Sequence, residues 1–242
     1  SVLHPRGKPR GITDVCNKST THYLLLTAHH NLGYSGGNNI GIKYALKHGA
    51  DYVFILNPDT IVEKDTLSKL VEITESDSQI GILGPTINEE NKVVYGGKVQ
   101  WCKSELEHIY LKPTTRHLKP NIYLIGAAAL IKREVIEKIG LLDERYFLYF
   151  EDADYCVRAS RAGYKLTIVP KAKVKHAVSA STSQLGSALL LRYHYRNAHL
   201  FNSKNGPWHI KFALPFWSIF IIIKQLIKIT FMPAKREISR AI

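Results

Sequence analysis

Two apolar runs near the start of the chain, Tyr23–Ala28 and Tyr52–Leu56, have the composition of strands. The second is rich in β-branched and aromatic residues without polar alternation, which is typical of a strand covered on both faces. Between them lie a glycine-rich loop and a helical stretch, Asn39–His48, that ends near Gly49. This order predicts a βαβ unit with a right-handed crossover, and therefore a parallel sheet.

Alternating helical and strand patterns continue to about residue 170. The predicted elements are a helix over Lys64–Glu75, a strand Ile80–Leu83 stopped by Gly84-Pro85, a hairpin with a loop within Val93–Lys119, a buried strand Ile122–Ile131, a helix Arg133–Ile139 ended by Gly140, a helix from Glu151 to Ala162, and a strand Leu166–Val169 before Pro170. Such alternation favours an α/β fold.

The pattern changes at Leu185, so we expect one domain over residues 1–184 and a helical, membrane-associating segment over 185–242. Leu185–Phe201 is predicted to be helical. Phe212–Met232 is strongly apolar, but its uninterrupted part is shorter than the ~20 residues needed to span a bilayer. Basic residues enter and flank it: Lys211, Lys224, Lys228, Lys235, Arg236 and Arg240. We expect a helix lying in the membrane interface, ahead of a packed core helix, with a true span third.

The charge balance changes the picture of possible partners. With 33 basic and 20 acidic residues, the formal net charge is +13, which implies an anionic partner: nucleic acid, a membrane surface or a phosphorylated substrate. Aromatic and basic residues are not interleaved on a recognisable nucleic-acid module, so we expect no nucleic acid. Cys16, Cys102 and Cys156 are far apart and odd in number, which speaks against disulfides and zinc and fits a reducing cytosol.

An acidic cluster is the most informative feature of the chain. Glu151, Asp152 and Asp154 fall within four residues, directly after the aromatic run Phe147–Phe150. Like charges this close repel each other, so the cluster does not stabilise packing. It suits a site that accepts a proton or holds a cation. The alternative is an acidic first turn favoured by the helix dipole.

Glycines and asparagines crowd the segment Asn31–Gly41, which is predicted to be a strand-to-helix loop. The residues are Gly33, Gly36, Gly37, Asn38 and Asn39. Glycines at such a place let backbone N–H groups approach a phosphate, and the following helix N-terminus favours negative charge. The spacing matches neither the dinucleotide fingerprint nor a Walker loop. A tight turn without a ligand is the alternative.

Asn57-Pro58-Asp59 follows the strand Tyr52–Leu56 directly, where ligands bind in open α/β sheets. Asp59 is therefore a candidate carboxylate for a divalent cation that bridges a diphosphate, and a turn or cap residue is the alternative. His176, after the last predicted strand, can return to the same sheet edge, although a lone histidine is more often an ordinary surface or core residue.

Taken together, these motifs resemble the family 2 glycosyltransferases, most closely the bacterial rhamnosyltransferase-like branch that builds cell-surface polysaccharides. The resemblance runs from about Asn31 to Asn197. It rests on Asn31–Asn39, Leu56-Asn57-Pro58-Asp59, Gly126-Ala127, Gly140–Arg158, Gly163-Tyr164 and His176.

The resemblance implies a GT-A fold, a three-layer α/β/α sandwich with a mostly parallel sheet. Asn57-Pro58-Asp59 replaces the family's D-x-D, so Asp59 and His176 would hold Mg²⁺ or Mn²⁺, and a nitrogen ligand suits Mn²⁺ better. Asn57, Asp59 and the glycine–asparagine segment would bind the nucleotide sugar. Asp152 matches the general base, with Glu151 and Asp154 positioning base or acceptor, whereas Arg158 is a structural partner of these carboxylates.

The implied reaction is inverting transfer of a sugar, with rhamnose as a candidate, from a nucleoside-diphosphate sugar to a hydroxyl of a glycan or polyprenyl-linked glycan. The basic surface and apolar tail would place the protein in the cytoplasm, at the inner face of the membrane.

One feature departs from the family, which begins with an apolar strand and a second strand ending at an Asp, both of which hold the nucleotide base. The residues before Tyr23 contain no such strand, and Asp14 and Asn17 are at best a remnant. The chain is therefore expected to be truncated and to lack its first strand. An inactive remnant or binding module, and a metal-dependent nucleotidyltransferase, are the alternatives.

Overall fold

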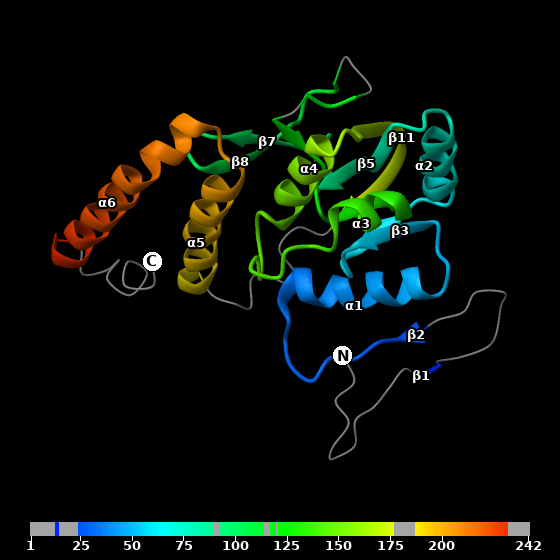
Figure 1. The fold of residues 1–242 in the computed structure, drawn as a ribbon, viewed down its shortest axis with the longest axis horizontal. Helices are drawn as coiled ribbons and strands as arrows, with labels where there is room; N and C mark the ends of the chain where they lie inside the picture. The colour runs from blue at the N-terminus through cyan, green and yellow to red at the C-terminus, as the bar shows by residue number, and fades with distance from the viewer. Residues whose placement is uncertain are drawn as a thin grey trace.

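A computed structural model of the chain describes residues 13–14, 24–89, 92–113, 117–119, 121–176 and 187–231. Its centre is a twisted six-stranded sheet in the order β3-β10-β5-β11-β4, with β6 paired to β5 (Figure 1). The strands are β3 (Tyr52–Leu56), β4 (Thr60–Val62), β5 (Ile80–Glu89), β6 (Lys92–Val94), β10 (Ala128–Lys132) and β11 (Lys165–His176).

The sheet is mixed, so the expectation of a mostly parallel sheet is wrong. β10 runs antiparallel to both β3 and β5, whereas β11 runs parallel to β5. The chain leaves the carboxyl end of β5 into a small sheet and re-enters from that same edge without a crossover helix, so β10 must run in the opposite direction. The small sheet contains β7 (Gly97–Gln100), β8 (Glu105–His108) and β9 (Ile122–Tyr123).

Helices cover both faces of the main sheet, which confirms three layers. α1 (Gly33–Lys47), α3 (Arg133–Ile139) and α4 (Glu151–Arg161) pack on one face through a core that includes Ile42, Val135 and Ala153. α2 (Thr66–Glu75) covers the other face, where Leu70 is fully buried. The predicted helices at 64–75, 133–139 and 151–162 are confirmed within two residues at each end.

Several predicted strand limits are wrong. β5 continues through Gly84-Pro85, and β11 continues through Pro170. Both strands remain paired because a bulge at one place accommodates the two prolines. Val169 pairs with Pro85, and the next pair is Lys173 with Thr86, so residues 170–172 bulge where the prolines lack N–H donors. The predicted strand Ile122–Ile131 is two strands, β9 and β10. The hairpin predicted within 93–119 is confirmed as β7 and β8.

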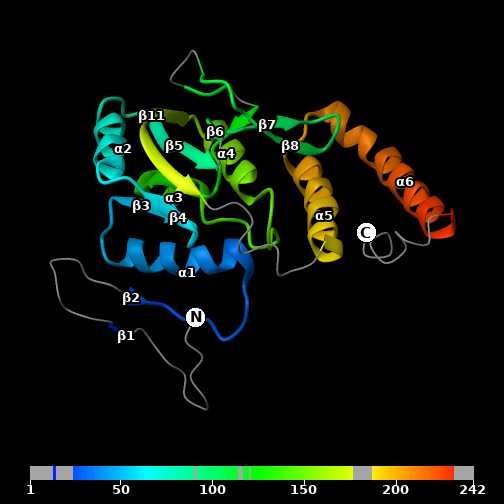
Figure 2. The same cartoon turned by 180° about the vertical axis from the view of Figure 1, so that it is seen from behind.

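The predicted first βαβ unit does not form. Within the described part of the chain, Leu24–Leu25 (β2) pairs with Thr13–Asp14 (β1) alone, antiparallel and outside the main sheet. α1 lies between this pair and the sheet (Figures 1 and 2). Of residues 1–23, where the first family strand was expected to be missing, only Thr13 and Asp14 belong to the described part.

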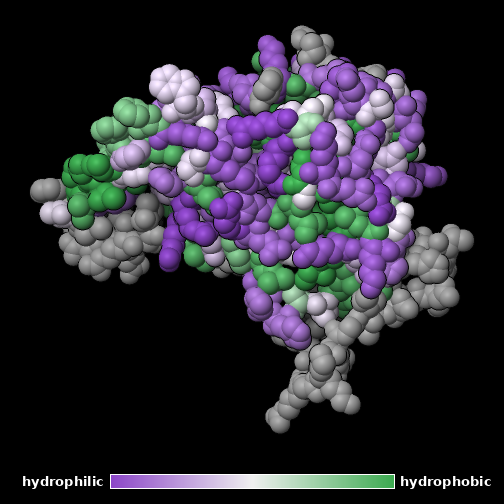
Figure 3. Space-filling model, viewed as in Figure 1, coloured by the Kyte–Doolittle hydropathy of each residue, from purple (hydrophilic) through white to green (hydrophobic). Residues whose placement is uncertain are grey.

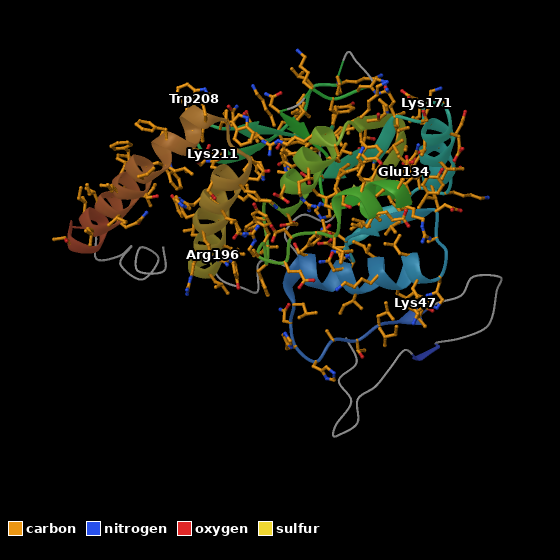
Figure 4. All side chains as sticks on the ribbon, in the orientation of Figure 1. Lys47, Glu134, Lys171, Arg196, Trp208 and Lys211 are labelled. Carbon is orange, nitrogen blue, oxygen red and sulfur yellow. The ribbon has the colours of Figure 1, made fainter. Side chains whose placement is uncertain are left out.

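Two helices form the last described stretch, α5 (Ser187–Asn205) and α6 (Trp208–Phe231). α6 projects from the body beside α5 (Figures 1 and 2), and Trp208 and Lys211 lie at its start (Figure 4). Among the described residues, Trp208–Ile227 is the one stretch long and apolar enough to cross a membrane, with a mean hydropathy of 1.7. Only 17% of that window is buried, so a packed core helix is wrong. Lys235, Arg236 and Arg240 lie outside the described residues.

Candidate active site

The carboxyl ends of three strands meet at one edge of the sheet. β3 and β5 both run antiparallel to β10, and β11 runs parallel to β5, so all three point the same way. Asp59 follows β3, and Glu89 and His176 are the last residues of β5 and β11. The turn after β3 crosses the start of β10, where the Asn57 N–H donates to the Ala127 carbonyl over 3.0 Å. This edge is therefore the place where residues distant in sequence converge.

Asp59 and His176 form a close pair at this edge. His176 Nε2 lies 3.3 Å from Asp59 Oδ1, and the two side chains are 12% and 13% exposed. Thr60, next to Asp59, is the register partner of His176 between β4 and β11, which explains the proximity. Asp59 Oδ1 is buried and has no hydrogen-bond donor within the described part of the chain.

This pair fits a divalent cation only with help. A buried carboxylate oxygen without a donor, facing an imidazole nitrogen, is a suitable pair of ligands. Among the described residues, no group of three or more His, Cys, Asp or Glu side chains is arranged to hold a metal ion. A cation there would complete its coordination shell with substrate phosphates and water, as Mg²⁺ commonly does.

Asp152 lies beside the same edge. Its Oδ2 accepts a hydrogen bond from the Gly126 N–H at 3.0 Å, and its Oδ1 accepts one from the Ala153 N–H at 2.7 Å. Gly126 precedes Ala127, the residue that bonds to Asn57. Burial raises the pKa of Asp152, while the hydrogen bonds from Gly126 and Ala153 and the nearby His108 oppose the increase. The result is a positioned carboxylate with increased basicity.

Glu151 follows a strained turn. Tyr149 and Phe150 both have φ of 71°, a left-handed conformation that costs bulky residues roughly 1–3 kcal/mol each. Glu151 is 6% exposed, and its Oε2 has no partner among the described residues. Burial, and then the neighbouring Asp152, raise the pKa of Glu151 well above its usual value. Strain and buried charge at one place are common at functional sites.

Asp154 has a different environment from Asp152. The two residues are two positions apart on α4, so their side chains lie on opposite sides of the helix. Asp154 is fully buried and pairs with Arg158 at 2.8 Å and with Lys204 at 2.9 Å, and Asn205 donates to it at 2.7 Å. Arg158 is thus a structural partner, as expected. Asp154 joins α4 to the end of α5 and does not face the edge at Gly126.

The glycine–asparagine segment is not a loop. α1 begins at Gly33, so Gly36, Gly37, Asn38 and Asn39 lie in its first turns. Gly33 has φ of +70°, and an added Cβ would lie 2.4 Å from the Phe147 carbonyl oxygen.

The buried residues of this segment hold the chain that leads to α4. Asn39 donates to the Leu142 carbonyl at 2.9 Å and accepts from the Leu142 N–H at 3.0 Å, while Ser35 donates to the Tyr146 carbonyl at 2.8 Å. The Asn38 side chain donates a hydrogen bond to the Tyr34 carbonyl within α1. A Cβ added to Gly37 would have no atom within 4 Å. The buried residues Ser35, Gly36, Asn39 and Ile42 recur at helical spacing, but three of them are not apolar, so the sequence lacks the apolar pattern that predicts a helix.

Two residues at the edge, Glu89 and His108, are not predicted as site residues from the sequence. Glu89 Oε1 lies 3.3 Å from His176 Nδ1, and Glu89 Oε2 lies 3.7 Å from His108 Nδ1. Nothing in their local spacing marks them, because Glu89 ends β5 and His108 ends β8, and only strand pairing brings them together. A cavity of about 30 Å³ lies against Asp152, Tyr34, Leu124 and Cys156, and Asp59 and His176 do not line it.

Comparison with known proteins agrees with the motifs. A family described as "Glycosyltransferase like family 2" matches residues 3–198, which extends the resemblance well before Asn31. The hexosyltransferase Agl10 of low-salt glycan biosynthesis in Haloferax volcanii is 28% identical over 76% of this chain and 61% of its own length. The chain thus spans less than two thirds of that relative.

Two further relatives are rhamnosyltransferases. The dTDP-rhamnosyl transferase RfbF of Shigella flexneri is 26% identical over 88% of this chain and 72% of its own. The N-acetylglucosaminyl-diphospho-decaprenol L-rhamnosyltransferase of Mycobacterium tuberculosis is 26% identical over 86% and 76%. Among solved structures, GalNAc-T7 with UDP, GalNAc and Mn²⁺ aligns with a TM-score of 0.49 at 18% identity, over 73% of this chain and 38% of its own, a likeness too distant to add to the argument. The family match covers most of the 242 residues, and the chain therefore belongs to the family 2 glycosyltransferases.

Proposed function

We propose that this protein is an inverting glycosyltransferase that moves a sugar from a nucleoside-diphosphate sugar to a hydroxyl of a glycan or lipid-linked glycan in cell-surface polysaccharide synthesis. Rhamnose from dTDP-rhamnose is the first candidate sugar, because two relatives are named for rhamnosyl transfer. A polyprenyl-diphosphate-linked GlcNAc is the first candidate acceptor for the same reason.

The observation that carries the proposal is the placement of Asp152. It is a half-buried carboxylate held by the Gly126 N–H, one residue from Ala127, whose carbonyl anchors the turn that leads to Asp59. A proton acceptor and the Asp59–His176 pair thus flank the same edge of the sheet. A single displacement needs both: a base for the acceptor's proton and a site that neutralises the leaving diphosphate.

In the proposed step, the acceptor oxygen forms a bond to the anomeric carbon while the bond from that carbon to the diphosphate oxygen breaks. Asp152 takes the acceptor's hydroxyl proton as the bond forms. Inversion needs one base and no enzyme nucleophile. Glu151, whose pKa burial raises well above its usual value, positions the base or the acceptor beside Asp152. We assign Asp154 a supporting role through Arg158 and Lys204, not contact with the substrate.

Asp59 and His176 would hold Mg²⁺ or Mn²⁺ in this proposal, with Asn57 supporting the turn. When bound, the cation would neutralise charge on the diphosphate leaving group. The first two turns of α1, with Gly37 exposed and Asn38 half-buried in the second, remain a candidate contact for the nucleotide sugar, because helix N-termini favour phosphate.

We further propose that the protein works in the cytoplasm, at the anionic inner face of the membrane, where a polyprenyl-linked acceptor resides. α6 exposes large apolar side chains, including Trp208, Phe212, Phe216 and Phe220. Figure 3 shows hydrophobic residues gathered over α6. Basic residues along this helix suit anionic headgroups.

The deciding experiment measures transfer by the purified full chain. dTDP-rhamnose, UDP-GlcNAc and GDP-mannose are each offered with Mn²⁺ and a polyprenyl-diphosphate GlcNAc acceptor, and product is followed by mass spectrometry. We expect transfer with one donor and a loss of about 10²–10⁴-fold in kcat for Asp152→Asn. Asp51→Asn, which changes an exposed aspartate directly before β3, is the matched control.

Two outcomes contradict the proposal. Donor-dependent activity that is indifferent to Asp152→Asn favours a nucleotidyltransferase, which has no need of this base. A folded protein that neither binds nor consumes any donor in the panel favours a binding module of the same fold.

A further inference from the structure

Glu89 lies between two histidines at the edge of the sheet. One oxygen is 3.3 Å from His176 Nδ1, and the other is 3.7 Å from His108 Nδ1. The carboxylate is 12% exposed, so water satisfies little of it. One oxygen is thus within hydrogen-bond distance of the His176 imidazole, and the His108 imidazole lies near the other.

The fold dictates this arrangement. Glu89 is the register partner of His176 where β5 and β11 run parallel, and it also pairs with Lys92 of β6. His108 ends β8 in the small sheet, where its register partner is Gly97 of β7. Glu89 thus occupies the seam where the main sheet and the small sheet meet, and it contacts a side chain from each.

An imidazole has two distinct nitrogens, and the hydrogen bond made by one determines the role of the other. A carboxylate beside Nδ1 favours the tautomer in which Nδ1 carries the proton. Nε2 then presents its lone pair, and in His176 this nitrogen faces Asp59 Oδ1 at 3.3 Å. Carboxylates that accept from metal-bound histidines in this way fix the ring and increase its basicity.

We propose that Glu89 is a positioning residue for His176, which it holds with Nδ1 protonated and Nε2 directed toward the cation site shared with Asp59. His108 Nδ1 lies 3.7 Å from the second oxygen of Glu89, so the small sheet places a second imidazole beside this carboxylate. The inference rests on the proposed function, in which Asp59 and His176 bind a divalent cation.

The experiment uses Mn²⁺ and inorganic pyrophosphate, which supplies the phosphate oxygens of a diphosphate whatever the sugar or base. Binding to the full chain is titrated by electron paramagnetic resonance, and spin-echo modulation reports a directly bound imidazole nitrogen. The variants are Glu89→Ala, Glu89→Gln and His176→Ala. Glu107→Gln, a neighbouring exposed carboxylate that bonds to Gln100, is the matched control.

We expect Glu89→Ala to weaken Mn²⁺ binding about 10–100-fold. Glu89→Gln keeps an acceptor oxygen, so it should lose less affinity and retain the nitrogen signal, and it covers the case in which the alanine variant fails to fold. Glu107→Gln should match the wild type.

The failures are distinguishable. If His176→Ala removes the nitrogen signal but both Glu89 variants bind like wild type, the positioning role is overturned and the proposed cation site stands. If His176→Ala keeps the nitrogen signal and wild-type affinity, the cation site itself is wrong. If Glu89→Gln loses as much affinity as Glu89→Ala or more, an acceptor oxygen is not what Glu89 supplies and the positioning role is wrong.

Discussion

Asp152 and Glu151 are adjacent carboxylates at the N-terminus of α4, and burial raises the pKa of both. The helix dipole favours their charged forms, but desolvation outweighs it at this position. Among the groups that oppose the increase at Asp152, His108 contributes through its positive charge, after the N–H groups of Gly126 and Ala153. The surroundings of Asp152 therefore tune its basicity, and the tuning can be measured.

The first prediction concerns pH dependence. A general base must be ionised, so kcat/KM should fall as pH drops through the raised pKa of Asp152. His108→Gln removes a side chain whose electrostatic interaction lowers the pKa of Asp152, so the acid limb should move to higher pH. A pH–rate profile from pH 4 to 9 tests this, with Glu107→Gln as control. An acid limb that stays in place or moves to lower pH contradicts it.

The second prediction concerns stability. The folded state binds a proton at Glu151 more tightly than the unfolded state, whose carboxyl titrates near its usual value of 4.5. Stability from this group is therefore lost as pH rises through the raised pKa. Glu151→Gln removes the loss, so its Tm should exceed wild type above neutral pH by roughly 2–4 °C per 1 kcal/mol recovered. The gap should shrink toward pH 4.5 in thermal melts, and a variant less stable at all pH values argues against it.

At the level of elements, α1 and α5 hold the segment that leads into α4. α1 binds it through Ser35 and Asn39. α5 donates from Asn197 to the Leu148 and Tyr149 carbonyls at 2.7 and 3.2 Å. Because α5 supports the strained turn, we propose that the catalytic domain includes α5 and that the membrane-associating segment begins at α6.

The third prediction tests the role of the α1 motif. Asn39→Ala leaves the buried N–H and carbonyl of Leu142 without partners, which costs about 1–3 kcal/mol for each buried group. We expect a clear decrease in the free energy of unfolding by urea. Asn38→Ala, whose side chain bonds to Tyr34 one turn earlier, should cost much less. Wild-type stability with a loss of donor affinity alone would instead assign Asn39 to nucleotide binding.

For the whole molecule, apolar surface and charge point to one orientation. α6 contacts α5 through Trp217, whose ring packs on that of Tyr195, and through Ser218, which bonds to His199, whereas Phe216, Phe220 and Ile223 are exposed. A contiguous exposed apolar surface on a protein of net charge +13 is a feature of membrane-surface binding.

The fourth prediction follows from this surface. Phe212→Ser, Phe216→Ser and Phe220→Ser combined should reduce co-sedimentation with phosphatidylcholine–phosphatidylglycerol vesicles at least tenfold, because each buried Phe contributes about 1.5–3 kcal/mol. Wild-type binding should weaken at high salt, since it is partly electrostatic. Leu111→Ser changes an exposed apolar residue elsewhere and should bind normally. Equal binding by all three proteins contradicts a membrane role for α6.

Most element types were predictable from the order of residues along the chain. The strand at Tyr52–Leu56, the helix ended by Gly163 and the acidic first turn of α4 follow from local patterns of burial, β-branching and glycine. The motifs at Asn57–Asp59, Glu151–Asp154 and His176 were sufficient to identify the family. Their residues and their order can be read from the sequence without knowing which residues are in contact. These features depend on residues that are close together in the sequence, so the sequence pattern is enough to predict them.

Other features depended on tertiary contacts. β10 runs antiparallel because the chain returns from the small sheet, and Asp154 lies in a cluster with Lys204, fifty residues away in the sequence. Glu89 meets His176 because β5 and β11 pair in register, and nothing in the residues around Glu89 encodes that partner. The sequence by itself determined which elements and which chemistry are present. Pairing between distant strands decided which side chains work together, since that choice depends on packing of the whole chain.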